Sequence, residues 1–396
     1  MLVALLGLAG CSGNNAATDI GTVELPATQN TAVSTEAATT VQVTTTEAAS
    51  EPETTIVLEE AAGESQVGDN TLDTFMRNAD DHSIWSDPSM MTGLAAPDAL
   101  FDTLNAEQKQ FYSLFYELDI ASAEAWFRDH PECLEDGYAH VLINESSLRS
   151  NGTTICTKLG EQVLAIDADN QILIMEVDCD GSRGVLAVGK HPSSLRLCPS
   201  SELPRCGETI GTIAEDNGGV LAITGSGFLD EGGVGNGSQI AGWALCSNGE
   251  SYGCHYGSGY KRIELHENGW LYIKDAFDPE GEGTVAGMEF TPGLLINGKR
   301  LDPGIWTSQN PRACIGQSDH GEILMLCVEG RTKASPGCSV EVCSDVLLQH
   351  GGITALNCDG GTTAILWYRG EPLIRCSNAA IPQGRYLPNA WVYVGD

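Results

Sequence analysis

The stretch LNCDGGTTAILWYRGE, residues 356–371, places one carboxylate in a glycine-rich turn between two apolar runs. As a local pattern it predicts a β-hairpin in which Asp359 and two glycines make the turn. A carboxylate in this position also has a chemical use, because neighbouring glycines let the backbone approach a ligand closely. Asp359 is therefore either a turn residue or a group that does chemistry, and the pattern alone favours the turn.

Two arginines bracket a second stretch, NPRACIGQSDHGEILMLCVEGR, residues 310–331. The pattern predicts two strands joined by a Ser-Asp-His-Gly turn, with Arg312 opening the first strand and Arg331 following the second. Such a hairpin puts both guanidinium groups at the same end of a sheet, where they can hold a phosphate group. The alternative is that both arginines are solvated surface charges.

A third stretch, residues 221–250, has seven glycines between Gly225 and Gly242, around Phe228 and Asp230. This composition allows close backbone approach to a ligand. An ordinary surface loop has the same composition, and local pattern alone favours that interpretation.

The elements that must position these residues fall into two parts. Residues 71–137 predict a small helical lead-in, with an apolar helix face in NAEQKQFYSLFYELD and a capping box made by Asn105 and Gln108. From residue 138 the sequence pattern predicts short strands and glycine-rich turns, including a hairpin over residues 162–178. One helix, with Ser339 as its N-cap, is expected over residues 339–350. We predict an α+β fold with mixed sheets for residues 138–396.

The N-terminal part predicts an anchor and a spacer. Residues 1–11, MLVALLGLAGC, are similar to a lipoprotein signal whose Cys11 is lipidated, although a fortuitous apolar run is the alternative. Because no basic residue precedes Arg77, we expect the natural chain to start further upstream. Residues 12–70 are rich in Thr, Ala, Glu and Ser without Lys, Arg or aromatic residues, which predicts a disordered linker. We therefore expect an extracytoplasmic protein that contacts the outer face of a membrane through its lipid only.

The net charge and the cysteine pattern exclude several classes of binding partner. The chain has 20 Lys and Arg against 54 Asp and Glu, a formal charge of −34. Nucleic acid is not expected as a partner, because phosphate backbones need a basic surface. No Cys-x-x-Cys pair or other familiar metal motif is present, so we assign no metal and no cofactor. Export makes disulfides plausible, with Cys198/Cys206 and Cys246/Cys254 as the first candidates.

Six stretches, in order, resemble the phosphodiester glycosidase family over about residues 160–396. They are Ile223–Phe228 with Gly235-Asn236-Gly237, then TPGLLINGK, NPRACIG, VEGR, ALNCDGGTT and GRYLPNAWVYV. The resemblance implies removal of a sugar from a sugar-1-phosphodiester. It implies catalytic roles for Asp359, Asn357 and Glu329, and phosphate binding by Arg312 and Arg331. It further implies substrate contacts for Thr224, Ser226, Gly227, Asp230, Asn236, Gly360, Gly361, Thr362 and Thr363.

Three positions depart from the family pattern. Thr224 stands where the family has Asn, Ser226 where it has Gly, and Glu329 where it has Asp. The first hypothesis is a surface-anchored hydrolase of a carbohydrate phosphodiester. The alternative is a catalytically impaired glycan-binding or scaffold lipoprotein of the same fold, which the change at Thr224 favours, because a hydroxyl lacks the two functions of an amide. A solute-binding lipoprotein is a weaker third hypothesis, because that class needs two α/β lobes. Convergence of Arg312, Arg331, Asp359 and the glycine loop on one pocket is the structural test of catalysis.

Overall fold

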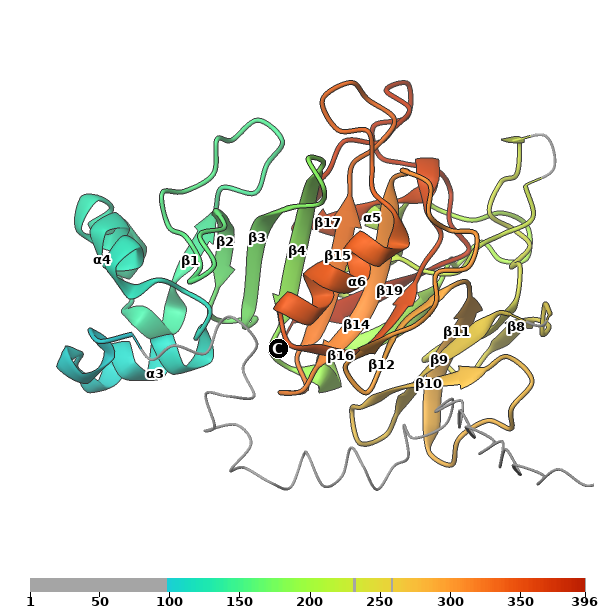
Figure 1. The fold of residues 1–396 in the computed structure, drawn as a ribbon, viewed down its shortest axis with the longest axis horizontal. Helices are drawn as coiled ribbons and strands as arrows, with labels where there is room; N and C mark the ends of the chain where they lie inside the picture. The colour runs from blue at the N-terminus through green and yellow to red at the C-terminus, as the bar shows by residue number, and fades with distance from the viewer. Residues whose placement is uncertain (1–97, 231–232, 258, 396) are drawn as a thin grey trace, which may run out of the picture. The chain divides into compact units, whose positions relative to one another are not determined.

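The computed structural model describes residues 98–230, 233–257 and 259–395 (Figure 1). The predicted signal with Cys11 and the predicted linker lie outside the described residues, as does the first part of the helical lead-in. Within the described ranges, no helix has the length and apolar character needed to cross a membrane.

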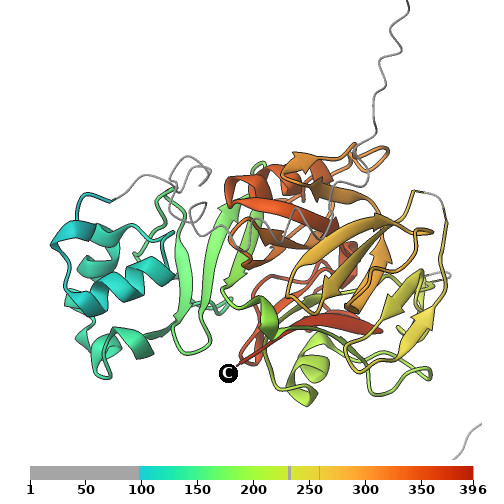
Figure 2. The ribbon, with the colours of Figure 1, turned by 90° about the horizontal axis from the view of Figure 1, so that it is seen from below.

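The helical lead-in contains two short α-helices, α3 (Ala106–Leu114) and α4 (Ile120–Asp129). The predicted capping box is confirmed: Asn105 accepts a hydrogen bond from the Gln108 N–H, and the Gln108 side chain accepts one from the Asn105 N–H. The helices bury Phe111, Phe115 and Phe127 against the first strands of the main sheet. Figure 2 shows these helices, in cyan, beside the green strands that follow them.

The largest sheet has nine strands in the order β1-β2-β3-β4-β15-β14-β16-β12-β13. Helix α6 (Val340–Gln349) begins after the N-cap Ser339, as predicted, and lies across the β14–β16 part of this sheet (Figure 1). The strands are β1 Leu142–Asn144, β2 Val163–Asp167, β3 Ile172–Asp178, β4 Arg183–Gly189, β12 Gly293–Ile296, β13 Lys299–Arg300, β14 Arg312–Ser318, β15 Ile323–Val328 and β16 Gly352–Asn357.

Two five-stranded sheets complete the domain, in the orders β10-β9-β11-β7-β8 and β18-β17-β6-β19-β5. Helix α5 (Ile210–Asp216) packs on the second of these sheets. The strands are β5 Leu195–Pro199, β6 Gly219–Thr224, β7 Trp243–Leu245, β8 Ser251–Gly253, β9 Lys261–His266, β10 Leu271–Asp275, β11 Thr284–Phe290, β17 Leu366–Tyr368, β18 Glu371–Pro372 and β19 Asn389–Val394.

The α+β class is confirmed, with four α-helices in the described residues, and the strands that pair there are antiparallel rather than mixed. Consecutive strands such as β2 and β3 are joined by short turns, which allow antiparallel pairing only, because parallel neighbours need long crossover connections. The predicted hairpin over 162–178 is confirmed as β2 and β3.

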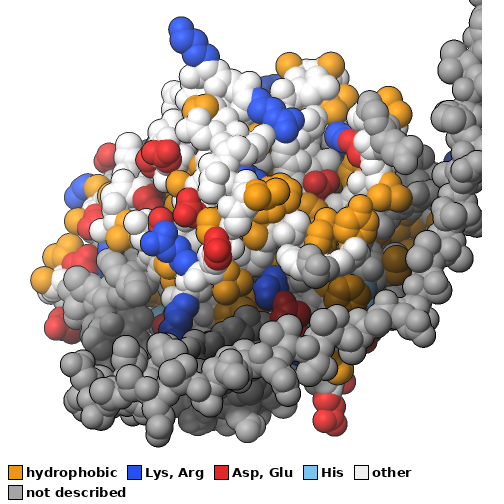
Figure 3. Space-filling model, turned by 45° about the vertical axis from the view of Figure 1, so that its right-hand side comes forward, with side chains coloured by type: hydrophobic (Ala, Val, Ile, Leu, Met, Phe, Trp, Pro, Cys, Tyr) orange, Lys and Arg blue, Asp and Glu red, His pale blue; other side chains and the backbone are white. Residues whose placement is uncertain are grey.

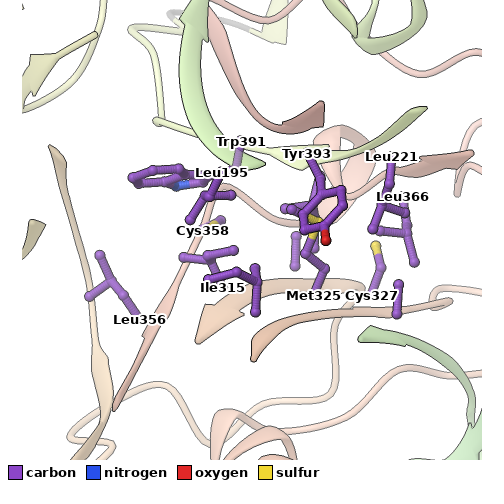
Figure 4. Close-up of a cluster of buried hydrophobic side chains, with 14 of the residues drawn as sticks. Leu195, Leu221, Ile315, Met325, Cys327, Leu356, Cys358, Leu366, Trp391 and Tyr393 are labelled. Atoms are coloured by element: carbon purple, nitrogen blue, oxygen red, sulfur yellow. The ribbon is translucent and has the colours of Figure 1, made fainter. Parts of the chain in front are cut away.

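The main core lies between the sheets. Leu356, Ile315 and Met325 of the nine-stranded sheet face Leu366 and Trp391 of a five-stranded sheet (Figure 4). Each side chain comes from the inward positions of a strand, as the two-residue period of a strand requires. Burying apolar side chains from both sheets holds the two layers together.

The predicted hairpin over residues 356–371 is wrong. Strand β16 pairs with β14 and β12 in the nine-stranded sheet, whereas β17 pairs with β6 and β18 in a five-stranded sheet. Between them, the chain crosses from one sheet to the other through a short 3-10 turn, Gly361–Thr363. Asp359 therefore lies where two layers meet, not at the tip of a hairpin.

The predicted disulfides are not formed, and the thirteen cysteines of the described residues are free thiols. For Cys246 and Cys254 the reason is the β7–β8 register. Leu245 pairs with Ser251 and Trp243 with Gly253, so the two cysteines follow opposite ends of that hairpin. Cys198 is buried on β5, whereas Cys206 is half-buried beyond the next turn.

Candidate active site

A cavity of about 210 Å³ opens where the β16–β17 crossing, the glycine loop after β6 and the segment after β15 meet. It contains seven of the residues predicted from sequence, which come from all three of these segments. The lining residues are Phe228, Asp230, Arg331, Asp359, Gly360, Gly361, Thr362, Thr363 and Arg385.

Backbone contacts fix Asp359 at this position. Its N–H donates to the carbonyl of Gly225 at 3.2 Å, and the N–H of Gly361 donates to the carbonyl of Pro311 at 3.0 Å. Gly361 has a φ of 64°, and a Cβ there would lie 2.9 Å from an Arg331 Nη2. A side chain at this position would therefore displace the guanidinium group from the cavity wall.

The environment of Asp359 raises its pKa to about 6, chiefly because the carboxyl group is desolvated. Hydrogen bonds from Thr363 and from the Gly360 N–H oppose this effect, and so does the positive charge of Arg385. A carboxyl group with a pKa near neutrality can exchange a proton at physiological pH, which is the requirement for acid–base work.

Arg331 supplies positive charge to the same cavity. Its backbone is in the left-handed region, with a φ of 61°, which is uncommon for a residue with a side chain. Its guanidinium group donates to the Thr362 hydroxyl at 3.2 Å and to the Asn310 side-chain oxygen at 3.3 Å. Both acceptors are neutral, so the charge of Arg331 is available to an anionic ligand.

Arg385 and Asp230 form another part of the cavity wall. The guanidinium group contacts both carboxylate oxygens, at 2.5 and 2.9 Å, and lies over the Phe228 ring. The hydrogen bonds from Arg385 lower the pKa of Asp230 to about 2, so Asp230 stays ionised when Asp359 is protonated. Sequence reasoning missed Arg385, although it lies in the GRYLPNAWVYV motif that helped to carry the resemblance.

The family model of phosphodiester glycosidases matches residues 217–394. These residues belong to the phosphodiester glycosidase family. The match includes the glycine loop, both arginines of the cavity and the β16–β17 crossing, so the predicted membership is confirmed and a glycosidase-type function is supported for this part of the chain.

Two solved structures of low sequence identity are similar to part of this chain. The catalytic domain of zebrafish N-acetylglucosamine-1-phosphodiester α-N-acetylglucosaminidase is 15% identical, with 57% of this chain and 82% of that chain covered and a TM-score of 0.47. A hypothetical protein from Synechocystis is 14% identical, with 60% and 65% covered and a TM-score of 0.40. No curated protein sequence matches the chain.

Thr224 and Ser226, which depart from the family pattern, lie outside the cavity lining and are buried. The Thr224 hydroxyl donates to the carbonyl of Thr363 at 2.6 Å, and accepts from the Ile365 N–H at 3.1 Å. Ser226 donates its N–H to the Asn389 side chain at 2.8 Å. Both residues thus tie the glycine loop to neighbouring strands, and Thr224 supports the turn that carries Thr363.

Arg312 does not join Arg331 in the cavity. Its side chain is buried, and its Nε donates to the carbonyl of Cys338 at 3.0 Å while an Nη2 donates to the carbonyl of Ser308 at 2.7 Å. Alternate residues of β14 face opposite sides of the sheet, and Arg312 shares the side of Cys314, against α6. The two guanidinium groups lie at one end of the sheet, as predicted, but they do not face a common phosphate. The expected convergence on one pocket therefore fails for Arg312 and holds for Arg331, Asp359 and Asp230 of the glycine loop.

Asn357 and Glu329 also lie outside this cavity. Asn357 is buried and donates to the carbonyl of Thr291 at 2.9 Å. Glu329 accepts from Arg183 at 3.1 Å and from the Arg375 N–H at 3.0 Å, and it lines a separate cavity of about 250 Å³. Neither side chain is placed to act on a group bound between Asp359 and Arg331.

The glycine loop contributes through its backbone. A Cβ at Gly227 would lie 2.5 Å from the Phe290 ring, so the loop needs glycine to pack on β11. Asn236, which the resemblance included, is exposed and donates to the carbonyl of Arg205 at 3.1 Å. Of the predicted loop residues, Asp230 alone reaches the cavity lining.

A larger cavity of about 560 Å³ lies at the other end of the β14–β15 hairpin, beside Tyr116, Lys190 and Glu322. Two charged groups of its lining, Lys190 and Glu322, are already paired, and Lys190 also contacts Glu117. The smaller cavity offers an unpaired cation and a carboxyl group of raised pKa, and we therefore take it as the candidate active site. In the described residues, no group of three or more His, Cys, Asp or Glu side chains is arranged to hold a metal ion.

Proposed function

We propose that this domain hydrolyses a sugar-1-phosphodiester at the bond between the anomeric carbon and the phosphate oxygen. The convergence of Asp359 and Arg331 on one cavity, within a phosphodiester glycosidase domain, carries this proposal. Breaking a glycosidic bond needs a carboxylate beside the anomeric carbon, as base or as nucleophile. The departing phosphate monoester needs positive charge rather than a proton donor.

The proposed roles follow from the electrostatics of the cavity. Asp359, when ionised, attacks the anomeric carbon or activates a water molecule. Arg331 binds the phosphate and stabilises the charge that develops on it. Asp230 remains ionised beside Arg385 and accepts hydrogen bonds from sugar hydroxyl groups. Because Asp359 acts in its ionised form, we expect activity to rise as the pH increases through about 6.

The test uses the full chain and the methyl ester of N-acetylglucosamine-1-phosphate. We expect release of free sugar, measured by chromatography, and a loss of about 10²–10⁴-fold in Asp359→Asn. Asp345→Asn, at an exposed carboxylate that pairs with Arg300, is the matched control and should keep full activity. Unchanged turnover in Asp359→Asn would remove this residue from the mechanism.

Hydrolysis in ¹⁸O-labelled water separates two kinds of bond cleavage. Attack at the anomeric carbon places the label in the sugar, whereas attack at phosphorus places it in the phosphate. Label in the phosphate would make the protein a phosphodiesterase and overturn the proposal.

A second candidate function is glycan binding without turnover. The observation that favours it is the departure at Thr224, whose hydroxyl serves the fold rather than the cavity. Saturable binding of the same phosphodiester, with no sugar released at any pH, would support this alternative.

We also propose that Cys11 carries a lipid that holds the domain at the outer face of a membrane. The apolar run before Cys11 and the Thr/Ala/Glu-rich linker after it support this proposal. Metabolic labelling with a fatty acid should mark the full chain but not the Cys11→Ser variant. Equal labelling of both proteins would contradict it.

A further inference from the structure

Four cysteines gather in the core between α6 and the nine-stranded sheet. Cys314 lies on β14, Cys343 lies within α6, and Cys338 precedes that helix, while Cys179 follows β3. All four side chains are fully buried in one apolar cluster. The Cys338 and Cys343 sulfur atoms are 3.5 Å apart.

The spacing of this pair follows from the start of the helix. Ser339 is the N-cap of α6, so Cys338 precedes the cap and Cys343 is the fourth residue inside the helix. Side chains at these two positions meet across the first turn, usually as an apolar pair that fixes the direction from which the chain enters. Here both positions hold thiols, and a rotation of the side chains can bring the sulfur atoms from 3.5 Å to the bond length of about 2 Å.

We propose that Cys338 and Cys343 form a disulfide in the mature protein, made by exchange with an oxidised dithiol protein of the compartment in which the chain folds. The thiolate of one cysteine of the pair attacks one sulfur of the oxidant disulfide and forms a mixed disulfide, and one oxidant thiolate leaves. The other cysteine then loses its proton and its sulfur attacks that of the first, which expels the second oxidant thiolate. Two protein thiols are oxidised and the oxidant disulfide is reduced to a dithiol.

In the folded domain, the surroundings give the two thiols different pKa values. Hydrogen bonds from the Cys179 and Cys343 thiols lower the pKa of Cys338 to about 5, and the positive charge of Arg312 acts in the same direction. The pKa of Cys343 is raised well above its ordinary value. Because both thiols are fully buried in the folded domain, the exchange takes place before α6 closes on the sheet.

The disulfide secures the segment that supports Arg331. Asn310 and Cys338 exchange backbone hydrogen bonds of 3.2 and 3.1 Å, and the Cys338 carbonyl also accepts from Arg312. The Asn310 side chain in turn accepts a hydrogen bond from Arg331 in the cavity wall. This consequence rests on the proposed function, whereas the covalent bond itself does not.

Peptide mapping of the full chain tests the bond without any measurement of activity. Protein produced in an oxidising compartment is treated with an alkylating reagent under denaturing conditions and then cut after glutamate. Cleavage at Glu341 falls between the two cysteines, so a disulfide keeps the two peptides joined until a reductant is added. We expect one joined pair, about 2 Da lighter than its separate thiol peptides together, because two hydrogens are lost.

Cys358→Ser is the matched control. Cys358 is also fully buried, but it lies in the core between the sheets, and its substitution should leave the joined pair intact. Cys343→Ser should leave Cys338 alkylated and the peptides separate. The proposal is overturned if Cys338 is joined to Cys179, if both thiols of the pair are alkylated in the wild type, or if the thiols retain one zinc ion per chain.

Discussion

The two ends of the β14–β15 hairpin each carry charged side chains, and they are built in opposite ways. At the turn, Lys190 contacts Glu117 and Glu322, and these side chains are only 4, 2 and 7% exposed. The Tyr116 hydroxyl donates to Glu322, and its ring lies 4.4 Å from the Lys190 ammonium group. At the other end, Arg331 is exposed and contacts neutral acceptors.

A structural cluster differs from a binding site in that its charged groups are satisfied by one another. In the Lys190 cluster, burial alone would lower the pKa of the ammonium group, but two carboxylates outweigh it and the pKa is raised. Because Glu117 follows α3 and Glu322 lies in the β14–β15 turn, the cluster joins the helical lead-in to the sheet. In the candidate site, by contrast, Asp359 has a raised pKa and Arg331 donates to neutral acceptors, so the positive charge of Arg331 is available to a ligand.

The structural role of the Lys190 cluster is tested by removing its cation. We expect Lys190→Met to lower the free energy of unfolding by about 3–5 kcal/mol, because it leaves two carboxylates buried without their cation. Urea denaturation measures the change. Arg300→Met, which breaks an ion pair whose side chains are 51 and 49% exposed, should cost less than about 1 kcal/mol. Equal effects would mean that the buried cluster is not a structural junction.

Arg331→Met tests the other end. We expect kcat/KM to fall by about 10²–10³-fold, because the charge that stabilises the departing phosphate is removed. The free energy of unfolding should change by less than about 0.5 kcal/mol, since the side chain is exposed. Lys333→Met removes a nearby exposed charge that does not line the cavity and should keep activity. A large stability loss without a kinetic effect would assign Arg331 to the fold.

Arg385→Met should change the pH dependence rather than abolish activity. Removing this cation raises the pKa of Asp359 and leaves Asp230 without its partner, so the midpoint near 6 should move up by about one pH unit. The pH profile of kcat/KM measures the shift. Arg385→Lys keeps a positive charge and should stay nearer the wild-type midpoint. If the midpoint stayed the same in both variants, the pH dependence of kcat/KM could not be assigned to Asp359.

The smallest expected effect is a gain of stability in Asp359→Asn. The folded-state pKa of about 6 exceeds the value of about 3.9 in an unfolded chain, so the protonated form favours folding and the ionised form opposes it. The stabilisation contributed by protonated Asp359 is fully present below about pH 4 and is lost as the pH rises through 6. We expect the variant to be about 1 kcal/mol more stable than the wild type at pH 8 and equal to it at pH 4. Thermal unfolding at both pH values measures the difference, and a gain at pH 4 would contradict it.

Local sequence signals predicted the elements well. The Asn105–Gln108 capping box, the Ser339 N-cap and the hairpin over 162–178 were all confirmed, because each depends on side chains a few residues apart. Asn297 and Gly298 likewise form a turn that local sequence explains, as the two residues join β12 to β13 with positive φ angles of 49° and 70°. Serial motifs likewise predicted the family of residues 217–394.

The site was predicted only in part. Asp359, Arg331 and Asp230 were expected and reach one cavity, but Arg312 and Asn357 turn to the other side of the sheet. Successive side chains of a strand point to opposite faces of the sheet. A shift of one residue therefore decides whether a side chain faces a ligand or a helix. Arg385 was missed because it joins the cavity from a segment more than 150 residues beyond its partner Asp230.

Local sequence alone therefore determined the type of each element and the order of the family motifs. It also determined that a carboxylate lies beside glycines at residue 359. Those features depend on neighbouring residues and on spacing. Tertiary structure alone decided that β16 and β17 belong to different sheets, which turns a predicted hairpin into the crossing that holds Asp359. It also decided which arginines face the cavity. The physical reason is that strand partners and buried charges are selected by packing between distant segments, which no local pattern records.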